Sequence, residues 1–236
     1  MVDSKDVSTK WAVLLGINAY PVHPLGGCVR DVSRIHNYLT SASTRVNVTA
    51  LTASPADDSL SSAIIESPSS RPTYNNVVSK LDEIADKATS GDHVHIHFSG
   101  HGTRNKLTGD FNLVLLDDDQ DIRYLGGHHL AGLLSKLVDK GLHVTLVLDC
   151  CFSGGILRQN DIHDPSVRTI EYDPGVDTRH PPAQLEAGRR TKSTLRDVTI
   201  LPRWLIDPRC YTVLTACGPH EKAQEHTAED GEKCGV

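Results

Sequence analysis

Two short segments, residues 95–102 (HIHFSGHG) and 146–155 (LVLDCCFSGG), decide the fold class of this chain. Each begins as an apolar run typical of a buried strand and continues directly into a glycine-containing turn. The first turn carries His101 and the second carries Cys151. A thiol nucleophile and an imidazole acid/base delivered from two strand ends are what covalent cysteine catalysis needs.

The rest of the chain alternates strand-like runs with helical patterns. Most of the runs lack polar–apolar alternation, as expected for strands that are covered on both faces. The alternation of strands and helices along the chain predicts an α/β fold in three layers, with a mostly parallel central sheet flanked by helices on both faces. We expect strands at 11–17, 46–52, 93–98, 143–148 and 211–215, and helices at 29–40, 75–88 (with Thr73 as its N-cap) and 130–139.

His101 and Cys151 both follow strand ends, where parallel sheets bind their ligands. Gly100 and Gly102 allow a tight turn around His101 and a close approach of a substrate carbonyl. We expect the backbone N–H groups of Gly102 and Cys151 to form an oxyanion hole. Strand alternation sends Cys150 to the opposite face, so we interpret it as a packing residue.

Composition narrows the functional classes. The chain has 236 residues, 38% hydrophobic and 23% charged, with a net charge of −6, which fits one large α/β domain. An acidic balance argues against nucleic-acid binding, and the absence of a long apolar run argues against a membrane span. The first ten residues lack the apolar core of a secretory signal. We therefore expect a cytoplasmic monomer.

The six cysteines favour free thiols over three disulfides. The chain is large, has no export signal, and places Cys150 next to Cys151. Thiols in a reducing compartment fit these features better.

Residues 157–209 break the regular pattern. This segment contains six prolines, many charges and little apolar periodicity. A long insert of this kind inside a compact domain is usually functional or disordered.

Three histidines alternate along one predicted strand, at His93, His95 and His97, and so share one face. Imidazole suits zinc, but no Cys or acidic residue lies nearby at zinc-ligand spacing. We favour packing histidines over a metal site.

Five motifs in this order resemble the caspase-like fold, specifically a type I metacaspase. The resemblance runs from about Trp11 to Glu225 and rests on AVLLGINAY (12–20), LGGCVRD (25–31), FSGHG (98–102), DCCFSG (149–154) and VLTACGP (213–219). It implies endopeptidase activity with Cys151 as nucleophile, His101 as acid/base, and cleavage after Arg or Lys. It also implies a large-subunit-like region at 11–156 after a tail at 1–10, a flexible processing loop at 157–209, and the start of a small-subunit-like region at 210–236.

The resemblance also implies a specificity pocket built from Asp31, Ser99 and Asp149, with Cys28 lining it. Two buried carboxylates without a partner are costly, so such a pocket favours a cationic side chain. Caspases have Gln-Ala where this chain has Asp149-Cys150, which replaces a neutral wall by a negative one. Each aspartate also has a purely structural alternative. Asp31 could lie on the solvated face of the first helix, and Asp149 could accept hydrogen bonds from the N–H groups of its turn.

The chain departs from the family in three places. Phe152 follows the nucleophile, where type I metacaspases often have His. Of the calcium site that activates many members, Asp110 alone is matched, so we expect no required cofactor, with calcium activation as the alternative. Family members continue past Gly235-Val236 with another strand and helix, so we expect a truncated chain.

The first functional hypothesis is a cysteine endopeptidase that acts on protein substrates after basic residues. We expect it to process itself within the 157–209 segment, with Arg190 and Lys192 as the preferred sites. A catalytically weak caspase-like scaffold and a zinc-binding or redox protein are the alternatives.

Overall fold

The computed structural model describes residues 8–42, 45–56, 63–105, 108–151, 167–181, 211–217, 223–229, 231 and 233–235. Five parallel strands form its central sheet, in the order β2-β1-β3-β7-β8. The strands are β1 (Lys10–Ile17), β2 (Val46–Ala53), β3 (His93–Ser99), β7 (His143–Asp149) and β8 (Thr212–Thr215). The predicted parallel α/β sheet is confirmed, with each strand within a residue of its expected run.

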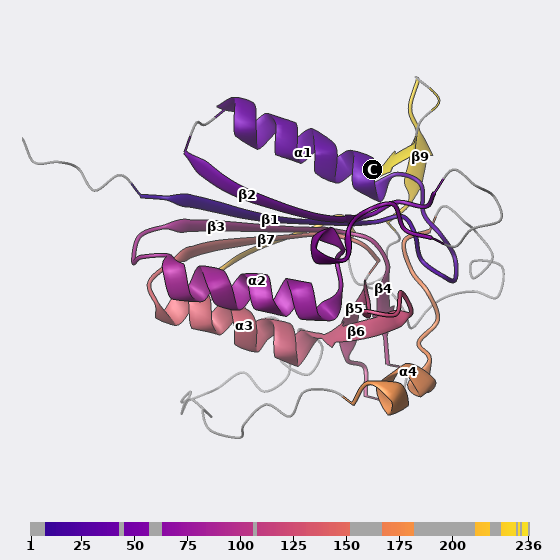
Figure 1. The fold of residues 1–236 in the computed structure, drawn as a ribbon. Coiled ribbons are helices and arrows are strands. Elements are labelled where there is room, and N and C mark those ends of the chain that lie inside the picture. The colour runs from indigo at the N-terminus through magenta and orange to yellow at the C-terminus, as the bar shows by residue number, and fades with distance from the viewer. Residues whose placement is uncertain are drawn as a thin grey trace, which may run out of the picture.

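Helices cover both faces of this sheet. Helix α1 (Cys28–Ala42) lies on one face, and α2 (Tyr74–Lys87) and α3 (Gly127–Asp139) lie side by side on the other (Figure 1). Thr73 caps α2 as expected, because its hydroxyl accepts a hydrogen bond from the N–H of Asn76 at 3.2 Å.

The alternation of β1 explains the two cores. Ala12 and Leu14 pack with Val32 on the α1 side, whereas Val13 and Leu15 join the larger core that includes the apolar residues of α2 and α3. Both sets are buried, so β1 is without polar side chains from Trp11 to Ile17.

A second, antiparallel sheet extends from the site end of the main sheet and was not predicted. It has the order β4-β5-β6, with β4 (Gly102–Arg104), β5 (Phe111–Leu116) and β6 (Ile122–Gly126). The acidic run after β5, residues 117–121, forms the β5–β6 turn. Asp117 is buried there and accepts hydrogen bonds from the N–H groups of Asp119 (2.9 Å) and Asp121 (2.8 Å).

Short elements complete the described chain. They are the 3-10 turn η1 (Pro68–Ser70), helix α4 (Pro174–Arg179), and the antiparallel pair β9 (Glu225–Thr227) and β10 (Lys233–Gly235). Within the insert expected to be a loop, residues 167–181 therefore include a helix and two isolated bridges, one to Gly102 and one to Gln224. No helix among the described residues is both long and apolar enough to span a membrane.

Candidate active site

The sheet register brings the two motif turns together. Strands β3 and β7 pair in parallel, with Ser99 opposite Asp149, so their carboxyl ends lie side by side. The N–H of Gly100 donates to the carbonyl oxygen of Asp149 at 3.4 Å. A Cβ on Gly100 would lie 2.5 Å from Oη of Tyr20, so glycine is needed at this crossing.

The ring of His101 packs against Tyr20, with ring centroids 4.6 Å apart. The Tyr20 hydroxyl accepts a hydrogen bond from the N–H of His101 (2.9 Å) and donates one to the carbonyl oxygen of Val114 (2.9 Å). A buried tyrosine from the loop after β1 thus fixes the turn that carries His101.

The buried His101 imidazole is neutral and presents one free acceptor. Its Nε2 lies 2.6 Å from the carbonyl oxygen of His23, so Nε2 carries the proton, and Nδ1 is the unprotonated nitrogen. Nδ1 is buried and has no hydrogen-bond partner among the described residues. Burial lowers the pKa of His101 to about 4, so the ring stays neutral near pH 7.

Cys151 follows β7 and is buried beside Ala223 and Cys217. Its Sγ donates to the carbonyl oxygen of Ala223 at 3.3 Å and accepts from the N–H of the same residue at 3.1 Å. The hydrogen bond with Cys217 and burial raise the pKa of the Cys151 thiol, so the thiol is protonated in this arrangement. Cys150 is buried in the large core instead, on the face that strand alternation predicts.

The two expected oxyanion donors converge on one carbonyl. The N–H of Gly102 (3.2 Å) and the N–H of Cys151 (3.1 Å) both donate to the carbonyl oxygen of Arg168. A Cβ on Gly102 would lie 2.2 Å from the carbonyl oxygen of Cys151, so only glycine fits. An acyl carbonyl is thus held where an oxyanion hole would hold it.

The side chain of Arg168 enters the pocket expected from the resemblance. It is fully buried, and one guanidinium nitrogen, Nη1, contacts Asp149 and the Ser99 hydroxyl (2.7 Å). The other nitrogen, Nη2, pairs with Asp31 at 2.7 Å. Burial raises the pKa of Asp149, and the positive charge of Arg168 opposes that rise. Cys28 also lines the pocket, and burial raises its pKa to about 12.

A further acidic residue, Glu225, contacts the same guanidinium. Its Oε1 lies 3.4 Å from Nη2 of Arg168, and its side chain is fully buried. Glu225 was not predicted as a site residue, because it lies in a polar tail that carries no motif. Arg168 was not predicted either, although the β-favouring run VRTI (167–170) distinguishes this part of the insert from its surroundings.

Residues 167–170 cross the site as an extended segment. Val167 forms an antiparallel bridge with Gln224, and Thr169 forms a parallel bridge with Gly102. The N–H of Arg168 donates to the carbonyl oxygen of Ala223 at 3.0 Å. Backbone hydrogen bonds on both sides of Arg168 are how an extended peptide is held against an open edge.

The remaining predicted residues lie elsewhere. Arg190 and Lys192 are outside the described residues. Asp110 lies before β5, where its carboxylate is 3.8 Å from Nε2 of His128. The described part of the chain contains no group of three His, Cys, Asp or Glu side chains that could hold a metal ion.

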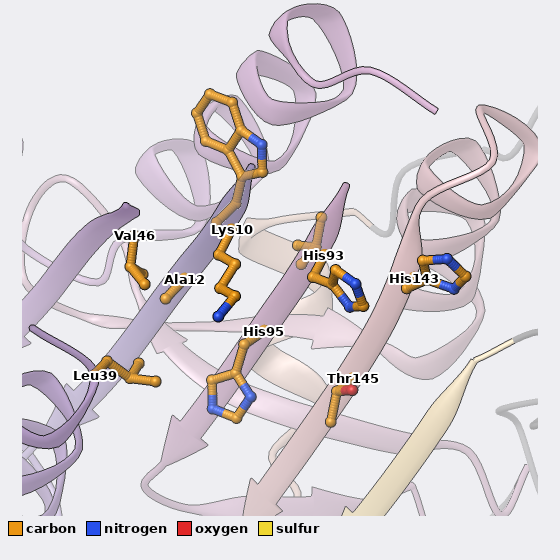
Figure 2. A pocket seen from close by; sticks show the side chains of 10 residues that line it. Lys10, Ala12, Leu39, Val46, His93, His95, His143 and Thr145 are labelled. Atoms are coloured by element: carbon orange, nitrogen blue, oxygen red, sulfur yellow. The ribbon is translucent and has the colours of Figure 1, made fainter. Parts of the chain in front are cut away.

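The three histidines of β3 lie away from the candidate active site. His93 and His95 are at the end of the sheet opposite Cys151, and His97 is buried. His93 stacks on His143 with ring centroids 4.8 Å apart, and with His95 and Lys10 they line a pocket (Figure 2). His97 is buried, and its Nε2 has no partner among the described residues.

The described cysteines are free thiols, namely Cys28, Cys150, Cys151, Cys217 and Cys234.

Comparison with known proteins identifies the family of this chain. Residues 10–160 match the family model described as metacaspase, peptidase C14 domain. The chain is 34% identical over 173 residues to metacaspase-4 of Arabidopsis thaliana, covering 64% of this chain and 35% of that protein. It is 32% identical over 160 residues to metacaspase-1B of Aspergillus terreus, covering 62% of this chain and 38% of that protein.

The chain spans about a third of the length of these curated relatives. A crystal structure of a protein from Geobacter sulfurreducens shares the fold, with a TM-score of 0.61 and 20% identity over 97% of this chain and 78% of that one. The family match covers more than half of the sequence and contains both His101 and Cys151. The chain therefore belongs to the metacaspase family.

Proposed function

We propose that this chain is a cysteine endopeptidase that cleaves peptide bonds after Arg or Lys. The observation that carries this proposal is the placement of Arg168. Its carbonyl oxygen accepts from the N–H groups of Gly102 and Cys151, while its guanidinium lies among buried carboxylates. One residue thus occupies both an oxyanion site and an acidic specificity pocket, as the residue before a cleaved bond must.

The proposed reaction starts from two neutral groups. Cys151 Sγ transfers its proton to Nδ1 of His101 and attacks the carbonyl carbon of the basic residue. The N–H groups of Gly102 and Cys151 stabilise the negative charge that develops on the carbonyl oxygen. Protonated His101 gives its proton to the leaving amine, which departs and leaves a thioester on Cys151. Water, deprotonated by His101, then hydrolyses the thioester and restores the thiol.

The acid and base roles agree with the surroundings of His101. The hydrogen bond from Nε2 to the carbonyl of His23 fixes the tautomer, so Nδ1 is the nitrogen left to accept a proton. The same hydrogen bond can stabilise the imidazolium that forms during the reaction. The Cys151 thiol is hydrogen-bonded to the backbone of Ala223 in this arrangement, so these hydrogen bonds must break before the thiol can transfer its proton to His101.

The position of Arg168 supports self-processing at the Arg168–Thr169 bond. Arg190 and Lys192 were preferred from the sequence because exposed basic residues are where proteases cut. Arg168 is instead the basic residue whose backbone and side chain both lie in the site. We therefore place the first self-cleavage after Arg168.

A fluorogenic peptide assay tests the function. The wild-type protein should cleave substrates with Arg before the reporter, and Cys151→Ala should abolish that activity. Asp31→Asn should weaken cleavage mainly through a higher KM, because a buried guanidinium loses one partner. Equal cleavage after Asp or Leu would refute the acidic pocket, and no cleavage at all would favour the scaffold function. Assays with and without millimolar calcium should be run in parallel.

Self-processing has its own measurement. N-terminal sequencing of fragments from the wild-type protein should give a new terminus at Thr169. The Cys151→Ala protein should stay intact under the same conditions. The same fragments in both samples would show a contaminating protease.

A further inference from the structure

The side chain of Glu225 contacts both the turn before α1 and the guanidinium of Arg168 in the pocket. Its carboxylate accepts hydrogen bonds from the N–H of Gly26 (3.0 Å) and the N–H of Gly27 (2.6 Å), just before α1. The same carboxylate contacts Nη2 of Arg168 at 3.4 Å. Lys233 lies 3.8 Å from its second oxygen, and the Lys233 side chain is 44% exposed. Glu225 is therefore a fully buried anion that faces both a structural turn and a bound cation.

The pocket presents its acceptors in pairs, which match the fork of a guanidinium. Nη1 of Arg168 contacts Asp149 and Ser99, and Nη2 contacts Asp31 and Glu225. A guanidinium is planar and carries several donors in fixed directions. An ammonium is a compact point charge on a flexible stem, so it cannot reach both pairs at once.

Glu225 makes the longest of these contacts, so a shorter ammonium would lose it first. The Nη2 atom of Arg168 lies 2.7 Å from Asp31 but 3.4 Å from Glu225. A lysine Nζ ends near the position of the guanidinium carbon, short of either Nη atom. We expect lysine to keep its attraction to the nearer carboxylates and to gain little from Glu225.

We propose that Glu225 is a specificity-determining residue that makes the pocket selective for Arg over Lys. This inference rests on the proposed function and deepens it, because an acidic pocket alone accepts either cation. The competing interpretation is that Glu225 only holds the Gly26–Gly27 turn. Glu225→Gln separates the two, because a glutamine side chain keeps an oxygen that can accept from the turn but loses the negative charge.

The first test is kinetic. Matched peptide substrates with Val-Arg and Val-Lys before the reporter should be compared in the wild-type protein and in Glu225→Gln. We expect the ratio of kcat/KM for Arg to that for Lys to fall about tenfold, equivalent to about 1.4 kcal/mol. The loss should appear mainly in KM for the Arg substrate.

Glu229→Gln is the matched control, since it makes the same change at an exposed position in the same segment. It should leave the ratio unchanged. A loss in Glu225→Gln that is equal for both substrates would show a structural role only and would overturn the inference. An unchanged ratio would overturn it as well.

The second test needs no catalysis, so it separates this inference from the proposed function. In the inactive Cys151→Ala protein, Arg168 itself serves as the bound cation. A double-mutant cycle combines Arg168→Lys with Glu225→Gln, and each protein is unfolded in urea. We expect Arg168→Lys to reduce the folding equilibrium constant about tenfold more when Glu225 is present than when it is replaced. Additive effects would overturn the selectivity assigned to Glu225, even if the protein cleaves peptides.

Discussion

Replacing Arg168 by Gln should strongly destabilise the protein, because it removes the cation from a buried acidic pocket. The test is best made in the Cys151→Ala background, where no self-cleavage can occur. In the parent, the Arg168 guanidinium is fully buried and contacts Asp31, Asp149 and Glu225. After the substitution, three carboxylates remain without that partner.

The magnitude follows from this burial. Removing one partner of a buried ion pair costs roughly 3–5 kcal/mol, because the remaining charge stays desolvated. We expect the free energy of unfolding to fall by about 4 kcal/mol at pH 7 for Arg168→Gln. The difference in the free energy of unfolding between Arg168→Gln and the Cys151→Ala protein should become smaller as the pH falls toward about 5. Burial raises the pKa of Asp149 and the positive charge of Arg168 opposes that rise, so Asp149 takes up a proton more readily once this charge is gone.

Urea unfolding followed by circular dichroism measures both effects. Arg179→Gln is the matched control in the same segment: its side chain is 49% exposed and pairs with Asp121 at 3.2 Å on the surface. Exposed pairs contribute about 0–1 kcal/mol, so this control should change stability little. If Arg168→Gln lost no more stability than Arg179→Gln, the pocket would not be the buried ion-pair site described here.

Three further predictions concern the catalytic turn and its surroundings. Gly102→Ala should lower kcat about a hundredfold, because its Cβ would lie 2.2 Å from the carbonyl oxygen of Cys151 and displace an oxyanion donor; a normal kcat would contradict that role. Cys150→Ala should keep most peptide cleavage whereas Cys151→Ala loses it, and equal loss in both would refute the assignment of the nucleophile. Burial lowers the pKa of His97 and of His101 to about 4, below the value of about 6.5 in an unfolded chain. As the pH drops, the unfolded state therefore binds protons before the folded state does, so the free energy of unfolding should fall by roughly 3 kcal/mol per histidine between pH 6.5 and pH 4. Urea unfolding at both pH values measures this change. The His97→Gln protein should show a weaker pH dependence.

The main sheet could be predicted from the sequence because its signals are local. Runs of Val, Leu and Ile mark the strands of the main sheet, and the stripe at Val77, Leu81 and Ile84 marks α2. The antiparallel β4-β5-β6 sheet was missed. Its strands are short, and FNLVLL (111–116) is apolar except for Asn112, so periodicity does not identify its partners.

The expected site residues lie together for the same reason. His101 and Cys151 follow strands that are neighbours in a parallel sheet, and such strands end at one edge. Their spacing and the glycines around them are visible in the sequence. The protonation of the two side chains is not visible, because it depends on the carbonyl of His23, on Ala223 and on burial.

The sequence by itself determined the fold class, the family resemblance, and the residues expected to act as nucleophile and base. The tertiary structure alone decided which basic residue fills the pocket and which third carboxylate holds it. Arg168 lies in a proline-rich insert, where the β-favouring run VRTI (167–170) indicates an extended segment but no site, and Glu225 lies in a polar tail that carries no motif. They meet Asp31 and Asp149 only because the folded chain brings segments separated by 137 and 57 residues to one buried cation. Long-range electrostatic pairing of this kind leaves no periodicity in a sequence, since it depends on distance in space and on the exclusion of water.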